Sequence, residues 1–410
     1  MDATAVTQTI VIAGGGLVGS LTALLVARQR ADIQLLVVEP TPAGPVPDKR
    51  TIALAAATVE LLEREGLWSA VAGAAEGIQH IHVSDKGYCG VTRLHAEQEG
   101  VPALGQVVPA AHLNRALFDA LAQMPNVEWR AEHQVSDFSY SADYVTVELQ
   151  GPQHITVELQ GPQHTESVRA CLLIGADGQR SLVRERAGIA QQTTDYGQTG
   201  IIATLELADD LEGWAYERFT DTGPVALLPL PNRAASLVWS VETEHADAIM
   251  ALPEAEFVRR VQQVFGYRAG RFTGVSGRIA YPLQLHLAER SVAHRTVIIG
   301  NASHTLHPIA GQGFNLGVRD AICLSQQLAQ STDPGSYTTL ADYWQLRAAD
   351  YQQIIGLTDG LVRGFSNHYW PLTKARNLAL LGLDALPPLR HAFAARTMGL
   401  AMTRNWQGGN

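Results

Sequence analysis

Apolar and polar residues at the start of the chain follow the pattern of a strand, a tight turn and a helix. Residues 9–27 form an uncharged stretch, which the adjacent glycines Gly14–Gly16 interrupt after the apolar run at 10–13. A membrane-spanning helix would be apolar at that point, so we predict a buried strand, a turn and a helix over residues 17–28 instead. The next apolar run, at 33–38, predicts a parallel strand joined by a right-handed crossover. The chain therefore begins as an α/β fold.

Beyond residue 39 the pattern changes between helical and strand-like segments. Helices are predicted at 51–65, 110–123, 254–265, 314–330 and from 340 onward, and strands at 78–94, 127–174, 199–241 and 296–299. We therefore predict an α/β, Rossmann-like domain that a sheet-rich substrate domain interrupts and C-terminal helices follow. The Rossmann-like domain comprises residues 1–76, 101–190 and 276–345, the sheet-rich domain 77–100 and 191–275, and the helical region 346–410.

Two segments permit more than one interpretation. VTVELQGPQH at 145–154 is followed by ITVELQGPQH at 155–164, which predicts a lengthened hairpin or an inserted loop without a chemical role. Residues 378–402 combine many Leu and Ala with Arg, so this helix packs on its own core, on a second subunit or on a membrane surface.

Composition and charge exclude several classes of protein. Of 410 residues, 46% are hydrophobic and 17% charged, which is typical of a globular protein. The net charge is -10 and no basic tract occurs, so nucleic acid is not an expected partner. The three cysteines lie far apart, which excludes dithiol oxidoreductases and fits a reducing compartment. Because the acidic start is unlike a signal peptide, we expect a cytoplasmic protein.

A glycine motif at the first turn predicts a dinucleotide site. Gly14, Gly16 and Gly19 form GxGxxG between strand and helix, and Glu39 ends the next strand. The first glycine permits the turn, the second lets the backbone approach a pyrophosphate, and the third lets helix and strand pack closely. A carboxylate at Glu39 accepts hydrogen bonds from a ribose and disfavours a 2'-phosphate. The motif therefore predicts FAD or NAD rather than NADP.

Two later segments narrow this prediction. At 171–184 an apolar strand ends in Asp177-Gly178, and at 297–320 another runs into Gly300-Asn301 before Pro308 and the turn Gly311-Gln312-Gly313. The second glycine turn opens a helix, and a helix N-terminus stabilises negative charge. This arrangement suits a cofactor that becomes anionic.

With these motifs in order, the chain resembles the FAD-dependent aromatic hydroxylases, flavoprotein monooxygenases of the p-hydroxybenzoate hydroxylase fold, over essentially its whole length. The family normally has Gly-Asp where this chain has Gly300-Asn301. Within the family, the chain most resembles the 2-octaprenyl-6-methoxyphenol hydroxylases of ubiquinone biosynthesis. The matching segments are Asp48–Leu54, His82–Asp85, Leu104–Val108 and Thr305–Asn315.

The resemblance implies an activity and its partners. FAD takes a hydride from transient NAD(P)H, reacts with molecular oxygen and, through a flavin hydroperoxide, hydroxylates the ring of a polyprenylated phenol. The resemblance is compatible with a peripheral position at the inner membrane face, with contact to other ubiquinone-biosynthesis proteins and with a homo-oligomer. The alternatives are hydroxylation of another aromatic substrate or ring position, and another FAD enzyme on this fold, such as a halogenase or a reductase. A flavin-binding protein that acts as a scaffold for other ubiquinone-biosynthesis enzymes is a further alternative.

The resemblance also implies roles for particular residues. Pro308, His304 and His307 are the candidate catalytic residues, although both histidines suit a structural turn equally well. Phe219, Leu228, Pro229 and Trp239 are candidates for the substrate pocket. No metal is expected, because His80 and His82 have no third ligand at a suitable spacing. The flavin contacts are expected to be Gly14, Gly16, Gly19, Glu39, Arg50, Gln106, Asp177, Gly178, Asn301, Pro308, Gly311, Gln312, Gly313, Phe314 and Asn315.

Overall fold

A six-stranded, mostly parallel sheet grows from the predicted strand–helix–strand unit. The computed structural model describes residues 8–151, 165–308, 311–365, 377, 379, 381–382 and 384–398. The strand order is β18-β19-β12-β1-β2-β8, and β1 pairs in parallel with β2 and β12. The carboxyl ends of these strands therefore share one edge. The strands are β1 (Gln8–Ala13), β2 (Ile33–Glu39), β8 (Val127–Ala131), β12 (Leu172–Gly175), β18 (Val292–Ala293) and β19 (Thr296–Ile298).

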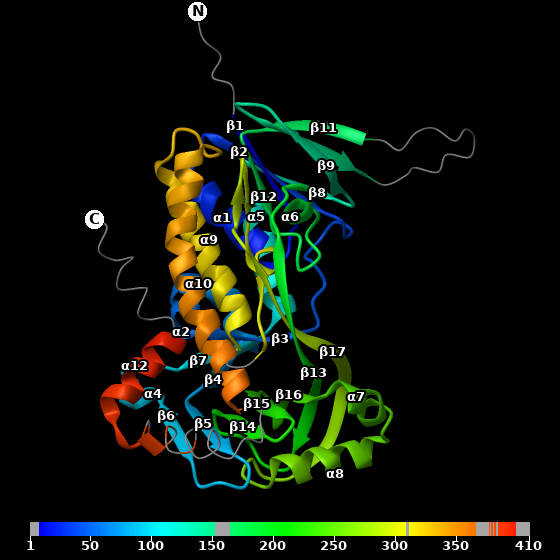
Figure 1. Cartoon of the computed structure of the whole chain (residues 1–410), viewed down its shortest axis with the longest axis vertical. Helices are drawn as coiled ribbons and strands as arrows, with labels where there is room; N and C mark the ends of the chain where they lie inside the picture. The colour runs from blue at the N-terminus through cyan, green and yellow to red at the C-terminus, as the bar shows by residue number, and fades with distance from the viewer. Residues whose placement is uncertain are drawn as a thin grey trace, which may run out of the picture.

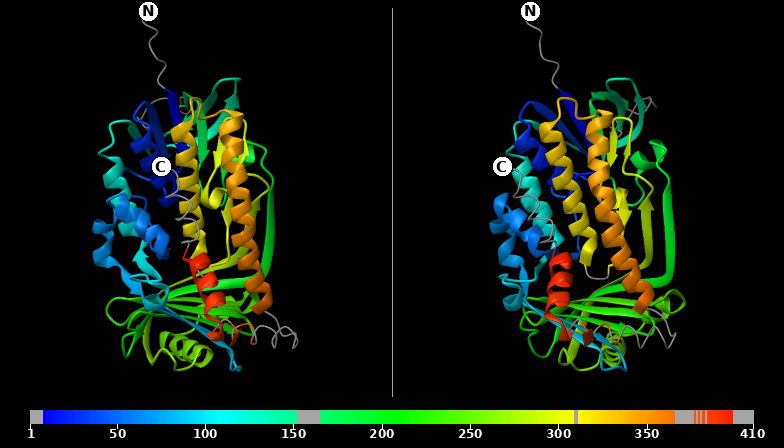
Figure 2. Two further views of the ribbon diagram at one scale, coloured as in Figure 1. Left: turned by 90° about the vertical axis from the view of Figure 1, so that its left-hand side faces the viewer. Right: turned by 60° about the vertical axis from the view of Figure 1, so that its left-hand side comes forward.

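Two further layers cover the faces of this sheet (Figure 1). Ile10 and Ile12 on β1 pack against the helical layer, in which α9 and α10 run side by side (Figure 2). Val11 and Ala13, which point the other way, pack against a three-stranded antiparallel sheet. The helices are α1 (Leu17–Gln29), α5 (Ala110–Leu121), α9 (Gln312–Gln330) and α10 (Tyr337–Phe365), and the strands β9 (Gln134–Tyr140), β10 (Val145–Gln150) and β11 (Thr165–Ala170).

A second domain lies below the first in Figure 1 and consists of an eight-stranded sheet with two helices beneath it. The strand order is β20-β17-β13-β16-β15-β14-β5-β6. The helices α7 (Thr243–Met250) and α8 (Glu254–Phe265) cover its lower face, whereas Leu228 and Leu230 on its upper face pack in one cluster with Ala394. The strands are β5 (His80–Asp85), β6 (Val91–His95), β13 (Gln191–Leu207), β14 (Trp214–Thr220), β15 (Gly223–Leu230), β16 (Ala234–Glu242), β17 (Phe272–Ala288) and β20 (His304–Thr305).

A small antiparallel sheet, β3-β7-β4, lies between the domains and corrects one prediction. Residues 51–55 were predicted to begin a helix, but they form β3 because they pair with β7, some 50 positions away in sequence. The helix starts only at Ala56. The remaining elements here are β3 (Thr51–Ala55), β4 (Glu76–Ile78), β7 (Gly105–Pro109), α2 (Ala56–Arg64), α3 (Trp68–Val71), η1 (Ala72–Ala74), α4 (Ala96–Glu99), α6 (Leu182–Arg186) and η2 (Gly300–Ala302).

The C-terminal part is helical as predicted, but its predicted start at 346 falls inside α10, which continues without a break from Tyr337 to Phe365. Of the predicted helix at 378–402, positions 378, 380, 383 and 399–402 lie outside the described residues, and most of the described positions are helical. The second copy of the repeat lies outside the described residues. The last described helix, α12 (Pro387–Thr397), packs beside the small sheet through Ala394. Among the described helices, none is both long and apolar enough to cross a membrane.

Candidate flavin and substrate site

The glycine turn after β1 leaves room where a pyrophosphate would lie. Gly14 has a φ of +101°, and a Cβ there would lie 2.5 Å from the carbonyl oxygen of Ala176. A Cβ at Gly19 would lie 2.0 Å from the carbonyl oxygen of Gly14, so α1 and β1 pack in contact. At Gly16, the N-cap of α1, a Cβ would meet nothing within 4 Å. Open space in front of uncapped helix N–H groups is an anion site.

Two carboxylates flank this turn at the same edge of the sheet. Glu39 is buried, and its Oε2 accepts a hydrogen bond of 2.8 Å from the Gly15 N–H. Asp177 follows β12, next to Gly14, and its Oδ2 accepts a hydrogen bond from the Val183 N–H at 3.1 Å. Its buried Oδ1 has no partner among the described residues. An unsatisfied acceptor costs about 1–3 kcal/mol, so a hydroxyl of a bound nucleotide fits this position.

The Gly300-Asn301 segment completes this edge at the end of β19. Gly300 has a φ of +57°, and its N–H donates to Asp320 Oδ2 at 2.9 Å. Asn301 is exposed in the following η2 turn, where its side-chain amide is accessible. Gly178, with a φ of +82°, turns the neighbouring segment in the same way. Four adjacent strands thus end in residues predicted to contact FAD.

The second glycine turn presents backbone rather than side chains. Gly311 has a φ of +61° and precedes α9 without a side-chain cap, and a Cβ at Gly313 would meet nothing within 4 Å. The side chain of Asn315 is fully occupied by protein: it accepts from the Ala55 N–H and Thr58 Oγ1 and donates to the carbonyl oxygens of Ala53 and Gly311. Gln312 is buried and Phe314 packs into the upper core. The N–H groups of this first turn are therefore what α9 offers an anionic flavin.

Arg50 and Gln106 lie at the junction of the two domains. Arg50 immediately precedes β3 and its side chain is 59% exposed, although it pairs with Asp48 at 2.6 Å, which raises the pKa of Arg50. Gln106 lies on β7, opposite Leu54 and Gly77 of the flanking strands. Tyr281, on β17 of the lower sheet, is within electrostatic reach of Arg50, and burial raises the pKa of its hydroxyl to about 12. This part of the site thus joins both domains.

The two candidate histidines are buried in different surroundings, and neither lies on an accessible surface. His304 has a side-chain exposure of 0%, and its Nε2 donates to Asp320 at 2.8 Å. Burial lowers the pKa of His307 to about 4, so this imidazole is neutral and a weak base at pH 7. His307 also packs edge-on against Tyr196, with ring centroids 5.6 Å apart. The structure thus places both histidines where they support the 300–308 turn, next to Pro308.

Asp320 on α9 is the centre of a buried polar network behind this turn. Its Oδ2 accepts from Gly300 and His304, and its Oδ1 accepts from Arg347 Nε and the Tyr351 hydroxyl, both at 2.8 Å. Burial by itself would raise the pKa of Asp320, but Arg347 and His304 lower it below the ordinary value. The network therefore keeps an ionised carboxylate under the cofactor edge.

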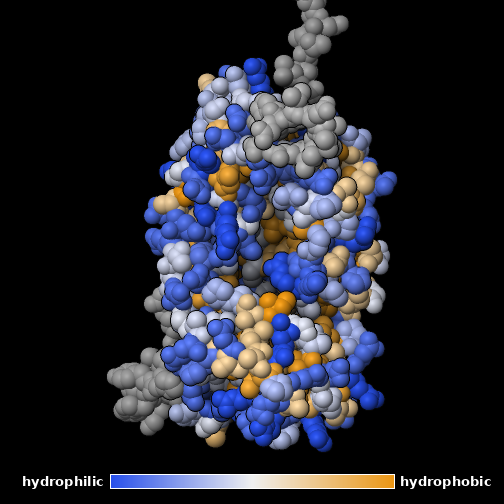
Figure 3. Space-filling model, turned by 90° about the vertical axis from the view of Figure 1, so that its right-hand side faces the viewer, coloured by the Kyte–Doolittle hydropathy of each residue, from blue (hydrophilic) through white to orange (hydrophobic). Residues whose placement is uncertain are grey.

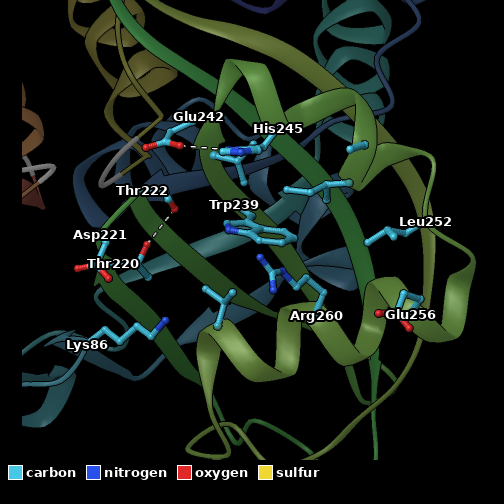
Figure 4. A pocket seen from close by; sticks show the side chains of 14 residues that line it. Lys86, Thr220, Asp221, Thr222, Trp239, Glu242, His245, Leu252, Glu256 and Arg260 are labelled. Carbon is cyan, nitrogen blue, oxygen red and sulfur yellow. Dashed lines mark hydrogen bonds and ion pairs between the residues drawn. The ribbon is translucent and has the colours of Figure 1, made fainter.

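Strand alternation separates the four residues predicted to line the substrate pocket. Leu228 and Phe219 lie on the upper face of the lower sheet, toward the flavin site. Trp239 points the opposite way, into the core between the sheet and the helices α7 and α8, and Pro229 shares its face. The cavity of about 490 Å³ that Trp239 lines is on that lower side, with Thr222, His245 and Arg260 around it (Figure 4).

The upper face also carries Glu217 and Tyr281, which the sequence analysis did not single out. Glu217 is the only carboxylate in the strand WAYERFT, at a position where every second residue points away from α8. A single carboxylate between the apolar residues Ala215 and Phe219 of the same strand face was the signal that could have identified it.

The fold and these four converging strand ends define a flavoprotein, and comparisons with known proteins agree. Residues 7–358 match the family described as "FAD binding domain", and the chain belongs to this family. It is an FAD-dependent monooxygenase, as predicted. A solved structure, p-nitrophenol 4-monooxygenase PnpA of Pseudomonas putida, shares the fold with a TM-score of 0.76 at 20% identity, covering 95% of this chain and 98% of that chain.

Among its relatives, the chain is similar to hydroxylases named for ubiquinone. Ubiquinone hydroxylase UbiL of Rhodospirillum rubrum is 35% identical over 95% of this chain and 89% of its own length. The 3-demethoxyubiquinol 3-hydroxylase of Escherichia coli is 32% identical over 95% of this chain and 98% of its own length. The predicted resemblance to hydroxylases of ubiquinone biosynthesis is thereby confirmed.

Proposed function

We propose that this enzyme hydroxylates the aromatic ring of a polyprenylated phenol of the 2-octaprenyl-6-methoxyphenol type in ubiquinone biosynthesis. Per turnover, one NAD(P)H, one O2 and one proton give NAD(P)+, one water and one new ring hydroxyl. FAD, when bound, takes up the hydride and activates the oxygen. Gly16, Glu39 and Asp177 hold its nucleotide part, and the first turn of α9 stabilises its negative charge.

The observation that carries this proposal is the apolar, incompletely sealed upper face of the lower sheet. Its residues Ile202, Ala226, Leu228 and Val238 are only half-buried, and Ile279 is 53% exposed, whereas their neighbours toward α7 and α8 are buried. A hollow with apolar atoms in its wall opens between the domains at mid-height (Figure 3). An apolar ring with a prenyl tail fits such a wall, which also excludes water from the reaction.

The tail of this substrate is dissolved in membrane lipid, so the enzyme must meet a lipid surface or a carrier. Leu381, Leu386 and Leu389, near the C-terminal end, are 46–52% exposed. We propose that this leucine group rests at the membrane surface. Flotation with liposomes of Escherichia coli lipid tests it: replacing Leu386 and Leu389 by Ser should release the enzyme, and unchanged flotation contradicts a membrane role of these leucines.

Oxygen-uptake and product measurements test the proposed reaction. Purified enzyme with bound flavin should consume O2 faster when 2-methoxy-6-prenylphenol is added with NADH or NADPH, and the product should gain 16 mass units. Gly16→Val, which fills the space in front of α1, serves as a flavin-free control. A reduced rather than hydroxylated product, formed equally well without O2, would indicate a reductase, and bound flavin without substrate-dependent O2 use would refute the proposal.

A further inference from the structure

Glu217 lies on the side of β14 that faces the flavin site. Its neighbour Tyr216 packs against Phe265 of α8, with ring centroids 5.8 Å apart, so alternation turns Glu217 to the opposite, upper face. Its strand partners are Ala226 on β15 and Val83 on β5. Leu228, two residues from Ala226, shares this face and belongs to the half-buried apolar wall described above.

The surroundings of this carboxylate are apolar. Among the described residues, none forms a hydrogen bond or an ion pair with Glu217, and burial raises its pKa to about 8. The side chain nevertheless keeps partial access to solvent. Asp85, which shares its face on β5, is bonded to Asn377, and the upper face of β15 carries no charged side chain in the described chain.

A carboxylate in this position requires a partner, and the described residues do not supply one. Burying a charge without one is unfavourable, and Glu217 is the only ionisable side chain on the upper face of β14 and β15, both of which are fully described. The proposed substrate carries one acidic O–H group on an otherwise apolar ring. The protein thus offers one carboxylate in an apolar wall, and the proposed substrate offers one phenolic hydroxyl on an apolar ring, so the two are complementary.

We propose that Glu217 is a catalytic residue that binds the phenolic hydroxyl of the substrate and accepts its proton during hydroxylation. This inference rests on the proposed function. As the ring carbon forms its bond to the oxygen atom derived from O2, the phenolic proton moves to Glu217 and the phenol oxygen becomes a carbonyl. The hydrogen on that ring carbon then leaves as a proton to water, the ring becomes aromatic again, and Glu217 returns its proton to the oxygen. Glu217 therefore ends the cycle ionised, as it began.

The test compares Glu217→Gln with wild type and with Glu206→Gln, a matched change of an exposed glutamate on the same sheet. Glu217→Gln should retain its flavin but lose about 100-fold or more in kcat, because general acid–base groups contribute roughly 10²–10⁴-fold. Wild-type kcat/KM should rise with pH through an apparent pKa near 8, as Glu217 ionises, and this rise should be absent in Glu217→Gln. A variant with wild-type kcat and pH profile overturns the proposal.

A binding measurement on wild type needs no variant and keeps the proposal testable if Glu217→Gln fails to fold. The quench of tryptophan fluorescence reports the affinity for 2-methoxy-6-prenylphenol and for its methyl ether, which lacks the hydroxyl. At pH 9 the phenol should bind at least tenfold more tightly, and equal affinities overturn the role of Glu217. If wild type shows this preference but forms no hydroxylated product, the proposed function fails while the phenol site stands.

Discussion

Replacing Asp320 by Asn should destabilise the protein and weaken its hold on FAD. The change keeps the size of the side chain but removes its charge and one acceptor oxygen. In the native network the two oxygens serve four donors, from Gly300, His304, Arg347 and Tyr351. An amide group can accept at only one of its two atoms. Two of these donors would therefore lose their acceptor.

The size of the effect follows from the burial of Arg347, whose side chain is 1% exposed. Removing one partner of a buried ion pair costs about 3–5 kcal/mol because the other charge stays buried. Arg347 keeps a second carboxylate, Asp350, at 2.5 Å, so we expect the lower end, about 3 kcal/mol. With roughly 2.1 cal/mol/K of unfolding entropy per residue, this corresponds to a fall in Tm of about 3–4 °C if the chain unfolds as one unit.

Thermal unfolding and an FAD titration of the apoprotein measure both effects. Because the Gly300 N–H bonds Asp320, loss of that bond should loosen the turn and raise the Kd for FAD about tenfold. Asp342→Asn, at an exposed position of α10, is the control and should change stability by less than about 0.5 kcal/mol. If Asp320→Asn unfolds and binds FAD like this control, the network does not support the flavin edge and our reasoning is refuted.

Three further predictions concern the cofactor site. Gly19→Ala should destabilise the fold by about 3 kcal/mol, since its methyl group would lie 2.0 Å from a backbone oxygen. Gly16→Val should instead leave Tm within a few degrees of wild type and abolish the flavin absorbance. Similar Tm values for the two variants would contradict the packing argument. Glu39→Gln should raise the Kd for FAD about tenfold in an apoprotein titration, and an unchanged Kd would exclude a ribose contact. His307→Asn should leave the pH dependence of kcat/KM between pH 6 and 9 unchanged, since its pKa of about 4 lies below that range; loss of a titration there would show that His307 takes part.

Much of the upper domain was predictable because its signals are local. The spacing of Gly14, Gly16 and Gly19 between a strand and a helix is contained within six residues, and both elements form where predicted. Residues 51–55 were assigned wrongly for the opposite reason. Their strand exists only through pairing with β7, a contact between segments far apart in the chain.

The site was less predictable because it depends on which face of each element meets the other domain. Phe219 and Trp239 are both apolar, yet only Phe219 points to the upper face of the sheet. Trp239 points to the lower face, which α7 and α8 cover. The same alternation of side chains along β14 places Glu217 on the upper face of the sheet. The partnership of Asp320 with Arg347 joins two helices and likewise leaves no pattern that a reader of the sequence could recognise.

The long strands β13 and β17 have a mechanical consequence for the substrate. Each has 17 residues, and together they form an antiparallel ribbon, kinked at a bulge near Asp195, that passes from the upper domain through the lower sheet. Moving the two domains apart would break hydrogen bonds between β13 and β17, each worth about 1 kcal/mol. We therefore expect the space between the domains to stay rigid and not to open by a hinge motion. The ring of the proposed substrate would then enter through the hollow between the domains, with its prenyl tail outside. Turnover should consequently be insensitive to how many isoprene units that tail contains.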